Sequence, residues 1–247
     1  MKKHGSFFAF LALFVCCGLI ASALFYHAEG LFGAMLTNAA EKDAPVIILD
    51  AGHGGEDGGA TGTNGVPEKD LNLSLSRTLA ALLRGAGYTV VQTRTEDKLL
   101  YPAGTKKGHK KQGDLTARLA YTEKYPNSIF VSIHMNTFPL PDCEGVQVWY
   151  SENHENSAVL AKAIQENVKA LLQPSNHRRI KAATSSIYIL KHAKTPAVLV
   201  ECGFLSTPAE CALLSDAAYR QKLALVLFDA ICDNLRSATC ESEENDV

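Results

Sequence analysis

Short apolar runs alternate with longer segments of helical periodicity along most of the chain. Runs rich in Val, Ile and Leu predict strands at residues 46–50, 88–92, 128–133, 146–150, 187–190 and 197–200. Amphipathic spacing predicts helices at residues 68–86, 115–124, 156–172 and 216–235. This alternation predicts an α/β fold, with about six strands in one mainly parallel sheet and helices on both of its faces.

The N-terminal segment has a different pattern. After two lysines and a histidine, residues 6–26 carry no charge and approach the ~20 residues that a helix needs to cross a bilayer. They predict a signal anchor in residues 1–27 that places the rest of the chain on the outer face of the membrane. The sequence "ASA" at residues 21–23 resembles a signal-peptidase site, so release by cleavage is the alternative.

The remaining sequence divides into three segments. Residues 28–44 predict a linker, residues 45–236 a single folded domain, and residues 237–247 an acidic, disordered tail. Within the domain, residues 99–112 carry four lysines and a histidine without apolar periodicity. They predict an exposed loop, which either is merely solvated or contacts a substrate or a protein partner.

Composition narrows the classes of partner. The chain has 247 residues, of which 20% are charged, and its formal net charge is -2. This balance gives no reason to expect a nucleic acid, and a small or neutral substrate fits better. The spacings of the cysteines outside residues 6–26 match no zinc or disulfide framework, so we expect free thiols.

A glycine-rich loop, "AGHGGEDGGATG", directly follows the first predicted strand. The dinucleotide-binding pattern G-x-G-x-x-G begins at Gly52 and Gly54, but Asp57 replaces the third glycine. Glu56 and Asp57 would also repel a phosphate placed on this turn. The loop is therefore not predicted to bind a phosphate.

Metal-binding residue types stand at the ends of several predicted strands. His53 follows the first strand, His134 the third and Glu201 the last, and Pro67 places Glu68 in the first turn of a helix. The carboxyl ends of parallel strands meet at one edge of a sheet. Two imidazoles and one carboxylate suit zinc with an open fourth position. We therefore predict that His53, Glu68 and His134 bind zinc and that Glu201 carries a proton.

Four stretches together resemble the zinc-dependent N-acetylmuramoyl-L-alanine amidases: "LDAGHGGEDGGATGTNGVPEKDLNL", "VVQTR", "FVSIHMN" and "PAVLVECGFLST". The resemblance implies an α/β catalytic domain over residues 45–236, with zinc held by the same three residues and catalysis assisted by Glu201. It implies hydrolysis of the amide between N-acetylmuramic acid and L-alanine. The chain departs from the family at Ala51, where proline is usual, and at Cys202, which we expect to face the core because neighbouring strand residues face opposite sides.

Within the family, "KKQGDLTAR", "SNHRRIKAATSSIYILKHAKTPAVLVECGFL" and a single domain behind an N-terminal anchor resemble the sporulation-specific amidase. That similarity implies a role in forming muramic-δ-lactam in the spore cortex. The implied partners are a peptidoglycan glycan strand with its stem peptide, the membrane through residues 6–26, and an activating protein. The implied location is the space between membrane and cell wall.

Other residues are candidates for supporting roles. Asp50 either orients a metal ligand or caps the turn, and Asn136 and His192 are candidates for substrate binding. The cations that are candidates for contacting an acidic stem peptide are Arg94, Arg178, Arg179 and Lys181. Two other functions stay open: a zinc exopeptidase acting on cell-wall peptides, and a wall-binding module without activity.

Overall fold

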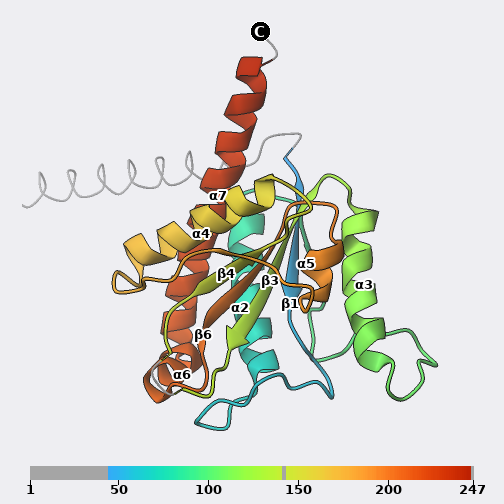
Figure 1. The fold of residues 1–247 in the computed structure, drawn as a ribbon. Coiled ribbons are helices and arrows are strands. Elements are labelled where there is room, and N and C mark those ends of the chain that lie inside the picture. The colour runs from blue at the N-terminus through green and yellow to red at the C-terminus, as the bar shows by residue number, and fades with distance from the viewer. Residues whose placement is uncertain (1–43, 141–142, 246–247) are drawn as a thin grey trace, which may run out of the picture.

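The computed structural model describes residues 44–140 and 143–245, and a single mixed sheet lies at its centre (Figure 1). The strands are β1 (Val46–Ala51), β2 (Val90–Gln92), β3 (Ser128–Asn136), β4 (Gln147–Tyr150), β5 (Lys181–Ala182) and β6 (Ala197–Phe204). Their order is β2-β1-β3-β6-β4-β5. The first four in this order are parallel, whereas β4 runs antiparallel to β6 and parallel to β5.

Helices cover both faces of the sheet, as the sequence predicts. One face carries α2 (Glu68–Gly85), α4 (Asn156–Leu171) and α7 (Ala217–Asn245), and the other carries α3 (Lys110–Lys124) and α5 (Tyr188–His192). A further short helix, α6 (Pro208–Ser215), packs against β6 and α7. The α/β fold with a mainly parallel six-stranded sheet is confirmed.

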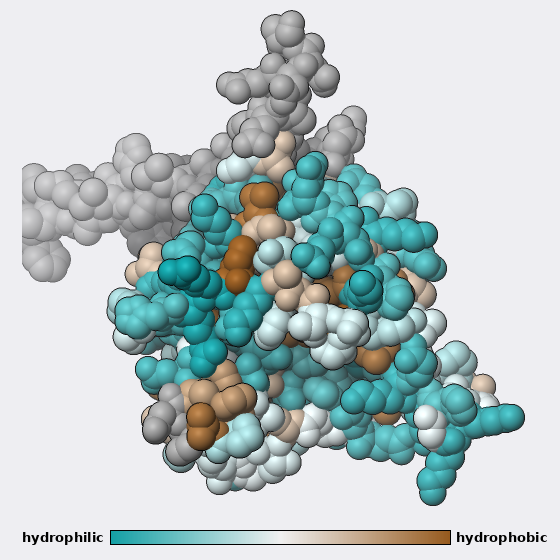
Figure 2. All heavy atoms as spheres, in the orientation of Figure 1, coloured by the Kyte–Doolittle hydropathy of each residue, from teal (hydrophilic) through white to brown (hydrophobic). Residues whose placement is uncertain are grey.

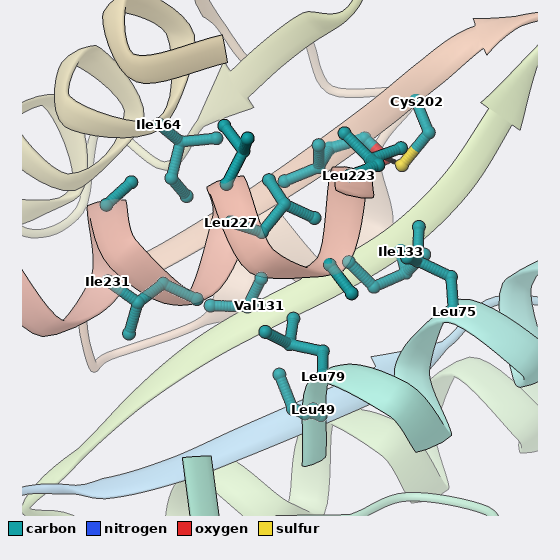
Figure 3. Packing of buried hydrophobic residues seen from close by; sticks show 14 of the residues in the cluster. Leu49, Leu75, Leu79, Val131, Ile133, Ile164, Cys202, Leu223, Leu227 and Ile231 are labelled. Atoms are coloured by element: carbon teal, nitrogen blue, oxygen red, sulfur yellow. Dashed lines mark hydrogen bonds between the residues drawn. The ribbon is translucent and has the colours of Figure 1, made fainter. Parts of the chain in front are cut away.

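Alternation along the central strands divides the core in two. Leu49 and Val131 face α2 and α7 in the larger cluster, whereas Ile48 and Phe130 face α3 and α5 in the smaller one. Cys202 is fully buried in the larger cluster, with Leu223 nearby (Figure 3), so the expectation that it is a core residue is confirmed. The surface view shows a mainly hydrophilic face with scattered hydrophobic residues (Figure 2).

One predicted strand is wrong. Residues 187–190 do not form a strand, because helix α5 begins at Tyr188 and buries Ile189 and Leu190 in the smaller core cluster. Periodicity alone cannot distinguish so short an apolar run in a strand from one in a helix. The sixth strand is instead β5, whose two residues pair with Trp149 and Tyr150.

The limits of two helices also differ from the prediction, and one helix was not predicted. Helix α7 continues to Asn245, where we expected disorder from residue 237, because "RSATCESEEN" contains no glycine or proline to stop it. Helix α3 begins at Lys110, so the end of the predicted basic loop is helical. Helix α6 was not predicted, although Pro208 at its first turn is a helix-start signal.

The predicted membrane segment, residues 6–26, lies outside the described residues, as does almost all of the predicted linker. Between residues 44 and 245, leaving out 141 and 142, no helix is long and apolar enough to cross a bilayer. Cys143, Cys202, Cys211 and Cys232 are free thiols in this part of the chain.

Candidate metal centre

Four predicted site residues meet at the carboxyl edge of the sheet. His53 follows β1, Glu68 is the first residue of α2, and His134 and Glu201 are paired residues on the neighbouring strands β3 and β6. One ligand atom each from His53, Glu68 and His134 lies within 4.8 Å of the other two. The three residues therefore form a possible metal site, as the strand-end pattern predicts.

The Glu68 carboxylate lies at the centre of this group. Its Oε1 atom is 2.9 Å from Nδ1 of His134 and 3.3 Å from Nε2 of His53. The main-chain N–H of Ala60 donates to Oε2 over 2.8 Å, and the main-chain N–H of Met135 and Nδ2 of Asn72 donate to Oε1 over 3.1 and 3.2 Å. Buried and held by these donors, the carboxylate has a fixed orientation.

The charges in the group reinforce one another. Burial alone would lower the pKa of His53, but hydrogen bonds and charge from Glu68 and Asp57 raise that pKa to about 9. Burial would raise the pKa of Glu68, but the two histidines hold it well below its usual range. A metal cation at this site would take the place of the protons on the imidazoles, since metal ligands bind deprotonated.

Asp57 is a site residue that the sequence analysis missed. Its Oδ2 atom lies 2.9 Å from Nδ1 of His53, and its Oδ1 atom accepts the N–H of Gly59. A carboxylate on the second nitrogen of a ligand imidazole fixes the ring orientation and tautomer. The available signal was an acid four residues after a candidate ligand in a glycine-rich turn, which we used only as an argument against phosphate.

Gly52 leaves the space that His134 occupies. A Cβ atom built at Gly52 would lie 2.2 Å from both Cε1 and Nε2 of the His134 ring, so any larger residue must displace this imidazole. Gly58 belongs to the same loop, and a Cβ atom there would meet nothing within 4 Å. Neither glycine has a positive φ, so the comparison tests space alone.

We predict that Gly52→Ala weakens zinc binding by roughly tenfold or more, because it moves one of three ligands. Gly58→Ala is the matched control and should bind metal as the unchanged protein does. Competition with a chromophoric chelator measures both affinities, and circular dichroism checks the fold. Equal affinities for the two variants would show that His134 does not depend on this space.

Glu201 lies beside the three candidate ligands. Its Oε2 atom is buried and has no hydrogen-bond partner in the described part of the chain. Burial raises the pKa of its carboxyl to about 7, with a further upward contribution from Glu68 and opposing ones from His134 and His53. An acid–base group with such a pKa can take up and release a proton near neutral pH.

A cleft of about 240 Å³ opens over this group. His53, His134 and Glu201 line one part of it, and Asp57 and Lys111 contribute charges. Side chains from β6, α3 and the segment containing α5 make up its apolar wall: Leu115, Ile187, Tyr188 and Leu199. A substrate with both apolar and charged groups can therefore reach the candidate metal ligands.

Asp50 does not contact a candidate ligand directly. It is buried, and it accepts hydrogen bonds from Thr93, Ser132 and the Arg118 guanidinium. Burial would raise the pKa of its carboxyl, but Arg118 and the two hydroxyls lower it below the ordinary value. Asp50 is thus the counter-ion of a buried arginine.

The structure does not bring the two candidate substrate-binding residues to the cleft. Oδ1 of Asn136 accepts the N–H of Thr137, and the exposed His192 ring packs on Tyr188 with ring centroids 4.6 Å apart. Neither lines the cleft. Arg94 is 1% exposed and binds main-chain oxygens, so it is not a surface cation for a stem peptide.

Other candidate cations have local partners. Arg178 packs over Phe204 and donates to the oxygen of Glu144, and Lys181 lies over the Trp149 ring. None of these residues lines the cleft that contains the candidate metal ligands. Lys111, which the sequence analysis did not single out, does line it.

Comparisons with known proteins cover most of this domain. Residues 47–233 match a family model described as N-acetylmuramoyl-L-alanine amidase. The chain is 34% identical over 187 residues to the germination-specific N-acetylmuramoyl-L-alanine amidase of Bacillus subtilis. The matched region covers 75% of this chain and 78% of that protein.

Solved structures give the same result. The structure of the CwlD amidase from Clostridioides difficile was determined in complex with the GerS lipoprotein, and it is 37% identical to this chain with a TM-score of 0.74. The superposition covers 78% of this chain and 99% of the CwlD chain. The amidase AmiC2 of Nostoc punctiforme is 26% identical with a TM-score of 0.68, covering 80% and 99% respectively.

Proposed function

The chain belongs to the N-acetylmuramoyl-L-alanine amidase family and is a peptidoglycan amidase, and from this premise we propose that it works with zinc held by His53, Glu68 and His134. One observation carries the proposal: these three donors converge beside Glu201, a half-buried residue whose buried Oε2 atom has no partner among the described residues. The bond cleaved is the amide between the lactyl group of N-acetylmuramic acid and L-alanine.

The donor set fits the metal. Two imidazole nitrogens and one carboxylate oxygen are a combination that catalytic zinc uses, with a fourth position left for water or substrate. Zinc bound here would supply Lewis acidity, polarising the amide carbonyl and lowering the pKa of a water molecule. The hydrogen bonds on Glu68 and the Asp57 contact on His53 hold two of the ligands in place.

Glu201 performs the proton transfers. Its carboxylate takes a proton from the attacking water and passes it to the departing alanine nitrogen, which would otherwise leave as a very poor amide anion. The cleft lined by Glu201, His53 and His134 also provides the wall against which the lactyl group and the peptide lie.

Mass spectrometry of muropeptides after digestion, with and without added zinc, tests this function. We expect zinc-dependent release of intact stem peptides that begin with L-alanine, together with glycan strands that lack peptides. Release of single amino acids would indicate an exopeptidase instead, and binding without turnover would indicate a wall-binding module.

The relatives support a role in spores. The Bacillus subtilis relative is named germination-specific, and we propose that this chain acts in cortex maturation, where removal of the stem peptide precedes formation of muramic-δ-lactam. Spores that lack this protein should then contain cortex without muramic-δ-lactam, which muropeptide analysis measures. Unchanged lactam content would contradict this role and leave the amidase chemistry intact.

We also propose that the chain acts outside the membrane, held there by residues 6–26. We predict that the full-length protein fractionates with membranes, whereas a chain that begins at Asp43 stays in the soluble fraction and folds. Immunoblotting of both fractions measures this. A mature N-terminus near Ala23 or Ala28 would show cleavage and remove the anchor.

A protein partner completes the proposed system. The structure of the Clostridioides difficile relative was determined in complex with a lipoprotein. In this chain, two of the three proposed ligands adjoin loops, whose conformation a bound partner could stabilise. We predict that the isolated domain binds zinc weakly and that an activating partner raises its activity, with zinc and partner tightening each other's binding. An isolated domain that keeps stoichiometric zinc through dialysis and digests peptidoglycan rapidly would contradict this.

A further inference from the structure

Two buried arginines donate hydrogen bonds to the main chain of residues 51–53, the segment that leads into His53. We propose that Arg94 and Arg118 are positioning residues that hold this segment in the conformation that brings His53 to the metal. The inference rests on the proposed function, since it concerns affinity for the same metal. It assigns a purpose to two side chains that are almost fully buried, at 1% and 2% exposure, yet carry positive charge.

Arg94 approaches the loop from the segment after β2. Its Nε atom donates to the oxygen of Ala51 over 2.8 Å, and its Nη2 atom donates to the oxygens of Gly52 and Lys69 over 2.9 and 2.8 Å. Lys69 directly follows the ligand Glu68. Arg94 therefore ties the loop that carries one ligand to the helix turn that carries another.

Arg118 reaches the same loop from α3. Its Nη1 atom donates to the oxygen of Ala51 over 2.8 Å, and its Nη2 atom donates to the oxygen of His53 over 2.7 Å. Asp50 and Asp114 neutralise its charge over 2.5 and 2.7 Å. The two arginines thus bind all three consecutive carbonyl groups of residues 51–53.

The loop needs this support for two reasons. His53 has a φ of 62°, a left-handed conformation that is uncommon for a residue with a side chain and costs free energy. The carbonyls of residues 51–53 also require donors, because buried main-chain oxygens are rarely left without a partner. A guanidinium has five donors in a rigid plane and can serve several carbonyls at once, whereas a lysine has three donors at one point.

Asn72 adds a third link. Its Nδ2 atom donates to the oxygen of Gly52 over 3.1 Å and to Oε1 of Glu68 over 3.2 Å. The oxygen of Gly52 therefore receives hydrogen bonds from both Arg94 and Asn72. A change in the path of the loop must disturb the orientation of Glu68 as well as that of His53.

The test compares Arg94→Lys and Arg118→Lys with Arg220→Lys. Arg220 is a half-buried arginine that also donates to a main-chain oxygen, that of Leu214, but it does not line the cleft with the candidate ligands. Zinc affinity is measured by chelator competition, the ligand geometry by the visible spectrum of the Co²⁺ form, and the fold by the Tm of the metal-free protein. Because none of these measurements depends on turnover, they separate this inference from the proposed function.

We expect Arg94→Lys and Arg118→Lys to bind zinc roughly 10- to 100-fold more weakly and to alter the Co²⁺ spectrum, and Arg220→Lys to do neither. If the unchanged protein binds no zinc, the proposed function fails together with this inference. If it binds zinc and Arg94→Lys binds equally well, only the inference is overturned. Arg118 is paired with two buried carboxylates, so Arg118→Lys can disturb the fold itself. Arg94 donates to main-chain oxygens instead, so Arg94→Lys tests the inference even if Arg118→Lys fails to fold.

Discussion

Replacing Glu201 with glutamine is expected to leave the metal bound and to slow turnover by roughly 10² to 10⁴. Glutamine has nearly the same shape but cannot accept the proton of the attacking water or return it to the leaving nitrogen. Burial raises the pKa of the Glu201 carboxyl to about 7 in the protein without metal. Its Oε2 atom makes no hydrogen bond in the described residues, so the substitution breaks no contact at that atom.

Two measurements on the same preparation check this expectation: turnover of purified peptidoglycan and bound zinc by elemental analysis. Glu123→Gln, an exposed carboxylate on α3, is the matched control and should change neither quantity. A Glu201→Gln protein that has lost its zinc would place Glu201 among the ligands. A Glu201→Gln protein that turns over substrate at the normal rate would show that Glu201 does not carry the proton.

The convergence of the candidate ligands could be predicted because each of them is marked by its own local sequence. His53 and His134 each come at the end of an apolar run in the sequence, and Pro67 marks the helix start that places Glu68. Because the carboxyl ends of parallel strands lie at one edge of a sheet, these residues are predicted to lie close together. No contact between distant side chains had to be known.

The supporting residues could not be predicted for the opposite reason. Arg94 and Arg118 are ordinary surface residue types by sequence, and their burial follows from the path of residues 51–53, which turns into left-handed conformation at His53. Asp50 has a strand-end position like those of the site residues, but its partner comes from 68 residues away. Helix α5 was mistaken for a strand because a single turn of apolar residues has no detectable period.

Removing one ligand should have the larger effect on activity. We expect His134→Ala to lose zinc and to digest peptidoglycan at the rate of the chelator-treated protein, below that of Glu201→Gln, because both the Lewis acid and its geometry are gone. The fold should survive. Glu68 keeps its donors Ala60, Met135 and Asn72, and the larger core cluster lies on the opposite side of the strands from the cleft.

The metal-free protein therefore differs from small domains that unfold without zinc. Zinc should still raise the Tm of the unchanged protein, since a ligand at 1,000 times its Kd stabilises the native state by about 4 kcal/mol. It should not raise that of His134→Ala, whereas the exposed His177→Ala control should respond fully. Calorimetry with and without zinc, together with digestion assays, measures both effects. A His134→Ala protein that keeps a zinc-dependent Tm and zinc-dependent digestion would place the metal elsewhere, because two remaining ligands would not hold a catalytic zinc ion in the required geometry.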